Sequence, residues 1–125
     1  VNINRELIAI ALDNLIENAL WYSSSGGDVW VRVKTGNNEV VIEINDTGIG
    51  ISEHEYGKIF QKFYRSQDAV RTHPDGSGLG LYIVKQISNL HNGTVTFKNK
   101  KGNGSLFSFI LPVAVNQQVV YNKKR

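Results

Sequence analysis

The sequence contains no cysteine, so disulfide bonds, thiolate metal ligands and a cysteine nucleophile are excluded. It has no apolar run of about 18 residues, the minimum for a membrane-spanning helix. Its first residues, from Val1 to Arg5, lack the basic and apolar segments of a secretory signal. These absences favour a cytoplasmic location. Because the first residue is not a methionine, we expect a piece of a longer protein, and membrane anchoring of that parent stays open.

The excess of positive charge is confined to the C-terminal end. Lys123, Lys124 and Arg125 account for the whole difference between 14 basic and 11 acidic side chains. A nucleic-acid-binding domain usually carries a basic stripe on its folded surface, so the balanced remainder argues against nucleic acid as a partner. A chain of 125 residues suits one compact domain. We expect that domain over residues 1–113, with a flexible basic tail over residues 114–125.

Hydrophobic periodicity predicts helices and strands in a mixed order. Helical spacing of apolar residues covers 7–22 and 79–90, and a shorter helical stretch is expected over 55–63. Alternation typical of half-buried strands covers 29–34, 40–46, 94–98 and 105–111. Residues 65–76 have no apolar period and predict a mobile loop. This order favours an α+β fold, a two-layer sandwich in which helices cover one face of a mixed, mostly antiparallel sheet.

The first predicted helix has two different faces. One stripe, expected to pack on the sheet, consists of Ile8, Leu12, Leu15, Ile16 and Ala19. The opposite face consists of Leu7, Ile10, Ala11, Asn14, Asn18 and Trp21. Asparagine is an indifferent helix former, and its carbonyl oxygen is a suitable ligand for Mg²⁺. Asn14 and Asn18 are therefore either part of a metal site or ordinary buried hydrogen-bonding side chains.

The sequence contains two glycine-rich segments, one after a predicted strand and one after the predicted loop. Asp46 ends a strand and is followed by Gly48 and Gly50, so its carboxylate either accepts a hydrogen bond from an exocyclic amine or lies solvated in a plain turn. The glycines between Gly76 and Gly80 lead straight into a helix, whose free N–H groups would bind a phosphate. A hinge before a helix is the alternative. The spacing matches neither a dinucleotide-binding fingerprint nor a P-loop.

In this order, the segments resemble the ATPase superfamily of sensor histidine kinases, type II topoisomerases, Hsp90 and MutL. Residues 12–19 are similar to the N box, 46–50 to the G1 box and 76–81 to the G2 box. Residues 59–65 resemble the F box, which has this form only in histidine kinases. Residues 102–104 resemble the closing glycine motif. The resemblance covers nearly the whole chain and implies the Bergerat-type fold.

The resemblance also implies ATP and Mg²⁺ as ligands. It implies that Asn14 holds Mg²⁺, that Asp46 accepts from the adenine amino group, and that residues 64–77 form an ATP lid. Phe60 and Phe63 would anchor that lid. The complete set of implied ATP-binding residues is Asn14, Asn18, Trp21, Asp46, Gly48, Gly50, Ile51, Lys62, Tyr64, Arg65, Gly76, Ser77, Gly78, Leu79, Gly80 and Leu81.

The activity implied is transfer of the γ-phosphoryl group of ATP to a histidine on a separate dimerisation and phosphoacceptor domain, with a response regulator receiver domain as the indirect partner. His54, His73 and His91 are poor acceptors and are expected at the surface, because one precedes the F-box segment, one lies in the lid and one ends a helix. They are also too scattered along the chain for a metal site. The chain has no covalent nucleophile or general base of its own. It is expected to be a monomer that turns over almost no ATP alone.

Two positions depart from the patterns of relatives. Histidine kinases usually have a lysine where this chain has Trp21, so one phosphate contact is missing unless Lys62 or Arg65 supplies the charge. The ATP-hydrolysing relatives have a glutamate where this chain has Ile10, which disfavours hydrolysis. Alternatives left open are an ATP-hydrolysing member, a serine-directed kinase and a degenerate interaction module that does not catalyse.

Overall fold

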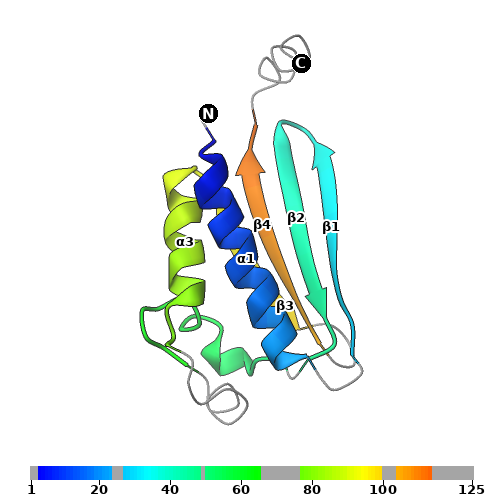
Figure 1. The fold of residues 1–125 in the computed structure, drawn as a ribbon, viewed down its shortest axis with the longest axis vertical. Coiled ribbons are helices and arrows are strands. Elements are labelled where there is room, and N and C mark those ends of the chain that lie inside the picture. The colour runs from blue at the N-terminus through cyan, green and yellow to red at the C-terminus, as the bar shows by residue number, and fades with distance from the viewer. Residues whose placement is uncertain (1–2, 24–26, 49, 66–76, 100–103, 114–125) are drawn as a thin grey trace.

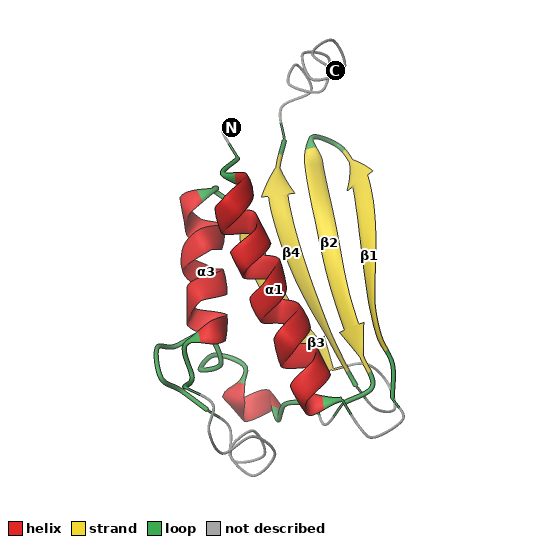
Figure 2. Cartoon of the chain, in the orientation of Figure 1, coloured by secondary structure: helices red, strands yellow, loops and turns green. Residues whose placement is uncertain are grey.

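The computed structural model describes residues 3–23, 27–48, 50–65, 77–99 and 104–113. Its elements, in chain order, are α1 (Arg5–Tyr22), β1 (Val29–Gly36), β2 (Glu39–Asp46), the 3-10 helix η1 (Glu53–Glu55), α3 (Gly80–Leu90), β3 (Thr94–Asn99) and β4 (Ser105–Pro112). The helices α1 and α3 lie side by side on one face of the sheet (Figures 1 and 2). The predicted two-layer α+β sandwich is confirmed.

The sheet has the strand order β1-β2-β4-β3. All three strand pairs are antiparallel, so the described sheet is antiparallel and not mixed. The β1–β2 turn contains Asn37 and Asn38 with φ of 41° and 64°, the left-handed conformation that tight hairpin turns need. The resulting register places Asp46 opposite Val29 on one side and opposite Ser105 on the other.

The core lies between the helices and the sheet. Alternate residues of β4 face the helices, with Phe107, Phe109 and Leu111 buried. The fully buried line of α1 consists of Ala11, Leu15 and Ala19. Ala11 was expected on the face opposite the core, and that expectation was wrong. Because α1 packs against α3 as well as the sheet, its buried line is turned toward both neighbours, and small alanines permit the close approach.

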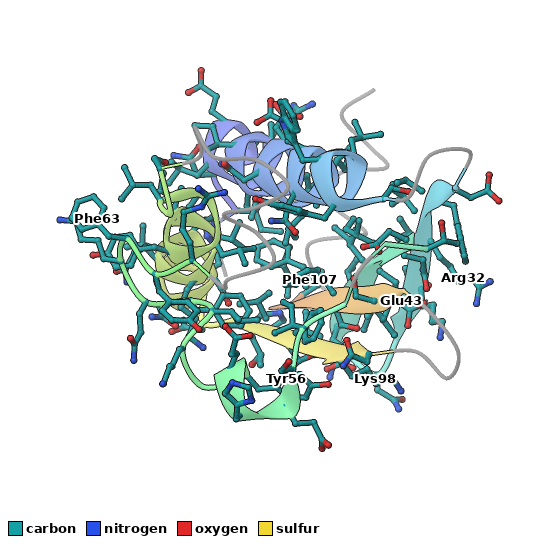
Figure 3. All side chains as sticks on the ribbon, turned by 90° about the horizontal axis from the view of Figure 1, so that it is seen from below. Arg32, Glu43, Tyr56, Phe63, Lys98 and Phe107 are labelled. Atoms are coloured by element: carbon teal, nitrogen blue, oxygen red, sulfur yellow. The ribbon has the colours of Figure 1, made fainter. Side chains whose placement is uncertain are left out.

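The edge strand β1 extends beyond the helices. Its side chains from Trp30 onward are exposed, and Val33 keeps 60% of its surface accessible. Arg32 lies opposite Glu43, and both lie at the sheet side of the molecule (Figure 3). The ammonium of Lys34 lies 3.3 Å from the Glu43 carboxylate. The ammonium is exposed and the carboxylate is partly buried, and an ion pair at a protein surface adds only about 0–1 kcal/mol to stability.

The short helix expected over 55–63 is not formed. Instead, backbone N–H groups donate to the carbonyl three residues earlier. The donors are Glu55, Tyr56, Lys58, Gln61 and Tyr64. Such bonds define the 3-10 helix η1 and a chain of turns. Within this segment Phe60 packs its ring edge-on against Phe107, with 6.3 Å between ring centroids. The prediction of a helix over 55–63 was therefore wrong.

His91 was expected at the surface, and it is buried, with 3% of its surface exposed. Its Nδ1 donates to the Ile87 carbonyl at 2.8 Å, and its Nε2 accepts from the backbone N–H of Asn4 at 3.0 Å. The ring therefore joins the end of α3 to the start of α1 in one neutral tautomer. His54 is exposed as expected, and His73 lies outside the described residues.

Candidate functional site

An open cavity of about 220 Å³ lies where the C-terminal end of α1 meets the N-terminal end of α3 and the segment after β2. These ends meet at the lower edge of the molecule in Figure 1. Most of the predicted site residues line this cavity: Asn14, Asn18, Trp21, Asp46, Gly50, Ile51, Tyr64, Arg65, Ser77, Gly78, Gly80 and Leu81. Segments that are far apart in the sequence therefore form one site.

Asp46 is buried at one end of the cavity, with both carboxylate oxygens bonded. Its Oδ1 accepts from the backbone N–H of Gly48 at 2.7 Å, and its Oδ2 accepts from the Ser105 hydroxyl at 2.7 Å. Only 3% of its surface is exposed, which excludes the alternative of a solvated turn aspartate. The two hydrogen bonds hold the carboxylate in one orientation, and carboxylate oxygens have lone pairs left for a ligand N–H.

Gly48 lies behind this carboxylate and does not line the cavity. A Cβ at this position would lie 2.1 Å from the carbonyl oxygen of Tyr22, at the end of α1. The close approach of two backbones therefore requires glycine here. Because Tyr22 itself lines the cavity, Gly48 determines how closely the segment after β2 and the end of α1 come together.

Asn14 presents its carbonyl oxygen to the start of α3. Its Nδ2 donates to the Ile10 carbonyl at 2.9 Å, which determines the amide orientation. Its Oδ1 lies 3.1 Å from the position that a Cβ of Gly80 would take. Asn18 lines the cavity one helical turn further on. The amide oxygen of Asn14 thus faces the start of α3, and an amide oxygen is a suitable ligand for an oxygen-liganded cation such as Mg²⁺.

The first turn of α3 faces the same space. Its N-cap residue, Leu79, makes no side-chain cap, although its backbone N–H donates to the Ser77 hydroxyl at 3.2 Å. The first N–H groups of an α-helix have no partner within the helix, and the helix dipole adds a partial positive charge there. Ser77, Gly78, Gly80 and Leu81 line the cavity around this turn. The arrangement favours an anionic ligand.

The two ends of the expected lid are held together. The backbone N–H of Phe63 donates to the Gly78 carbonyl at 2.9 Å. Arg65 donates from Nη2 to the Tyr22 hydroxyl at 3.1 Å, across the cavity mouth. The Tyr64 hydroxyl donates to the Glu55 carboxylate, and this bond, burial and the carboxylate charge together raise the pKa of Tyr64 above 10.0. Residues 66–76, most of the expected lid and Gly76 included, lie outside the described residues.

Some expected contacts lie elsewhere. The ammonium of Lys62 lies 5.3 Å from the ring centroid of Phe63 and 5.8 Å from that of Tyr82, outside the cavity. The Phe63 ring projects from the surface (Figure 3) and is 64% exposed, so Phe63 contacts Gly78 through its backbone and not through its ring. Leu79 also lies outside the cavity lining, whereas Trp21 lines it and is 51% exposed.

Several lining residues were not predicted from sequence. They are Glu17, Tyr22, Ile59, Ser105 and Phe107. Glu17 shares the helical repeat of Asn14 and could have been found from the i, i+3 spacing. Ser105 carries no sequence signal of its own, because its contact with Asp46 depends on the β2–β4 register.

Residues 3–115 match the family model described as histidine kinase-, DNA gyrase B-, and HSP90-like ATPase. The chain is 39% identical over 109 residues to the sensor histidine kinase YclK of Bacillus subtilis, covering 86% of this chain and 23% of that protein. It is 36% identical over 120 residues to the sensor histidine kinase WalK of the same species, covering 94% of this chain and 20% of WalK.

Solved structures give the same result. The mycobacterial sensor histidine kinase MprB matches with a TM-score of 0.81 and 33% identity, covering 90% of this chain and 76% of that one. Full-length ShkA, solved in complex with AMPPNP, matches with a TM-score of 0.72 and 28% identity, covering 86% of this chain and 22% of that one. None of the helices within the described ranges is long and apolar enough to cross a membrane.

Fold and cavity together define an ATP-binding α+β domain. The chain belongs to the family of histidine kinase-, DNA gyrase B- and HSP90-like ATPases, and it has the features of the ATP-binding catalytic domain of a sensor histidine kinase. It spans only about a fifth to a quarter of the length of YclK and WalK, which are multidomain proteins by their length.

Proposed function

We propose that this chain binds Mg-ATP and donates the γ-phosphoryl group to a histidine on a separate dimerisation and phosphoacceptor domain of its parent protein. A response regulator receiver domain would then take the phosphoryl group from that histidine. The chain itself would act as a monomer without nucleic acid, and a cytoplasmic location stays a prediction. The observation that carries the proposal is one cavity with a fixed carboxylate at one end and an amide oxygen beside a helix N-terminus at the other.

The adenine base fits the Asp46 end. Gly48 N–H and the Ser105 hydroxyl occupy one lone pair on each oxygen of the carboxylate, so each oxygen keeps acceptor capacity, and Asp46 lines the cavity. An exocyclic amine of adenine is a donor of the matching kind. Gly50 and Ile51 would form the wall against which the flat base packs. This geometry supports discrimination of adenine from guanine, whose carbonyl would meet a carboxylate.

The phosphates fit the other end. Backbone N–H groups in the first turn of α3 would donate to phosphate oxygens, and the guanidinium of Arg65, which donates to the Tyr22 hydroxyl and lines the cavity, would add a positive charge. Asn14 is the residue that would hold Mg²⁺, because its amide nitrogen is engaged and its oxygen is directed at Gly80. When bound, Mg²⁺ supplies charge neutralisation on the phosphates.

The acceptor is expected outside this chain. His91 uses both ring nitrogens in buried hydrogen bonds at the far end of the molecule, and His54 is exposed at η1, away from the cavity lining. The chain's residues would therefore bind and orient ATP until an acceptor docks. Near-zero turnover of ATP by the chain alone follows.

A second candidate, hydrolysis of ATP, is favoured by one observation. Glu17 lines the cavity beside Asn14, and a carboxylate there could activate water. Ile10, at the position where hydrolytic relatives have glutamate, speaks against it. Steady Mg²⁺-dependent phosphate release that disappears in Glu17→Gln would establish this candidate in place of the kinase.

The deciding experiment mixes the chain with the dimerisation domain of its parent protein and ATP labelled at the γ-phosphate. We expect label on the dimerisation domain that is lost in acid and retained in alkali, as for phosphohistidine. Asn14→Ala should abolish the transfer. A shift of melting temperature with Mg-ATP, measured beforehand, tests binding alone, because a ligand specific for the folded state must stabilise that state. Binding without transfer would support the interaction-module alternative.

A further inference from the structure

A side chain holds the backbone of Ile51 at the cavity wall. The Oδ1 of Asn99, at the end of β3, accepts from the Ile51 N–H at 3.0 Å. The Nδ2 of the same side chain donates to the Ile51 carbonyl at 2.6 Å. Asn99 does not line the cavity, whereas Ile51 does. A residue outside the site thus engages both backbone groups of a residue inside it.

The carboxamide of asparagine has the same donor and acceptor as a peptide group. Pairing with both the N–H and the C=O of one residue reproduces what a neighbouring strand does in an antiparallel ladder. Ile51 lies in no strand, so Asn99 supplies the partner that the sheet does not. The carboxamide also approaches Gly50 closely, since a Cβ there would lie 2.8 Å from Asn99 Oδ1.

Asn99 is itself held in place. Its backbone N–H donates to the Tyr56 hydroxyl at 3.3 Å, and the Tyr56 ring packs edge-on against Phe97 with 5.2 Å between centroids. Asn99 also pairs across the sheet with Ser105, the residue whose hydroxyl donates to Asp46. The end of the β3–β4 pair therefore holds both ends of the segment between Asp46 and Ile51.

We propose that Asn99 is a positioning residue for the adenine end of the site. It holds Ile51 and Gly50 at the distance from Asp46 that one flat base requires. This inference rests on the proposed binding of ATP, and it assigns to Asn99 a role in base selectivity without contact to the nucleotide.

The first test needs no ligand. Amide hydrogen exchange of the chain, resolved by residue, should show a protected Ile51 N–H. Asn99→Ala should speed exchange at Ile51 by about tenfold, the loss expected for one hydrogen bond, and leave Ile42 in the β2 ladder unchanged. Equal exchange at Ile51 in both proteins would overturn the inference while leaving the proposed function untouched.

The second test measures dissociation constants for Mg-ATP, Mg-ADP and Mg-GTP by calorimetry, well below the melting temperature. Asn99→Asp is nearly isosteric and keeps the acceptor for Ile51 N–H, but it replaces the donor with a charge facing the Ile51 carbonyl. We expect each variant, Asn99→Asp and Asn99→Ala, to raise the dissociation constants of Mg-ATP and Mg-ADP by about tenfold, equally for the two nucleotides. The ratio of the GTP to the ATP dissociation constant should fall. A smaller fraction of folded protein would weaken both nucleotides alike and leave this ratio unchanged.

Thr96→Ala, at an exposed position of the same strand, is the matched control and should bind like the parent chain. Unchanged affinity and unchanged ATP/GTP preference in both Asn99 variants would overturn the inference alone. Failure of the unsubstituted chain to bind any adenine nucleotide would overturn the inference and the proposed function together.

Discussion

The two ends of the cavity are built differently. At the end proposed to bind adenine, called the adenine end below, Asp46 is buried, bonded through both oxygens and flanked by Ser105 on the neighbouring strand. At the end proposed to bind the phosphates, called the phosphate end below, the groups are the start of a helix, an amide held by one hydrogen bond and the long side chain of Arg65. The adenine end is thus preorganised by the sheet before a ligand arrives, whereas the phosphate end depends on groups that a charged ligand can still orient.

The largest expected effect comes from breaking the adenine end. Asp46→Asn replaces one of the two acceptor oxygens with an NH2 group, which meets either the N–H of Gly48 or the hydroxyl of Ser105 and leaves one oxygen fewer to accept from the adenine amine. We expect affinity for ATP and ADP to fall by about a hundredfold, since a buried donor is left unpaired. Calorimetric titration measures it. Asp28→Asn, at an exposed carboxylate nearby, is the control, and an equal loss there would contradict the assignment.

A substitution at the phosphate end should weaken ATP binding in Mg²⁺ but not in EDTA. Asn14→Ala removes the amide oxygen beside Gly80, and we expect ATP affinity in Mg²⁺ to fall about tenfold. Affinity measured in EDTA should hardly change, because the lost contact is to the cation. The comparison of titrations with and without Mg²⁺ checks this, with Asn89→Ala on the exposed face of α3 as control. A drop that is equal in EDTA would point to a phosphate contact in place of a metal contact.

A substitution that adds a positive charge at Trp21 is expected to raise the affinity for ATP. Trp21 of α1 lines the cavity, and the resemblance to histidine kinases implies a lysine at this position. Trp21→Lys adds an ammonium near the phosphates, and we expect ATP to bind several-fold, about fivefold, more tightly, with a smaller gain for ADP. The gain should shrink as salt is raised, because exposed charges are screened. If Trp21 instead packs over the nucleotide, the substitution lowers affinity.

The smallest effect concerns Tyr64, between the two ends. Its hydrogen bond to Glu55, followed by burial and the charge of that carboxylate, raises the pKa of Tyr64 above the ordinary 10.0. A raised folded-state pKa means that the stability from this bond is present below about pH 10 and is lost as the pH rises through the folded pKa. Tyr64→Phe should lower the melting temperature by roughly 3 °C at about pH 8 and by less at about pH 11. A difference that grows with pH would contradict the bond.

Predictions from the sequence were correct for features that depend on neighbouring residues in the chain. The hairpin turn at Asn37 and Asn38, the helix end at Asn92 with φ of 55°, and the alternation in β4 follow from side-chain and backbone preferences of neighbouring residues. Predictions from the sequence were wrong for features that depend on contacts between residues far apart in the chain. Residues 55–63 form turns and not a helix, with Phe60 packed against Phe107 from the distant strand β4, and the buried His91 accepts a hydrogen bond from Asn4, 87 residues away in the chain.

The sequence by itself determined the α+β class, the positions of Asn14 and Asp46, and the glycines that lead into α3, because spacing and residue chemistry are properties of a short stretch of chain. The tertiary structure decided which residues orient them. Ser105 and Asn99 are ordinary strand residues in the sequence, and only the register of β2, β4 and β3 brings a hydroxyl to Asp46 and a carboxamide to Ile51. Register depends on how whole strands pack, which no single residue specifies.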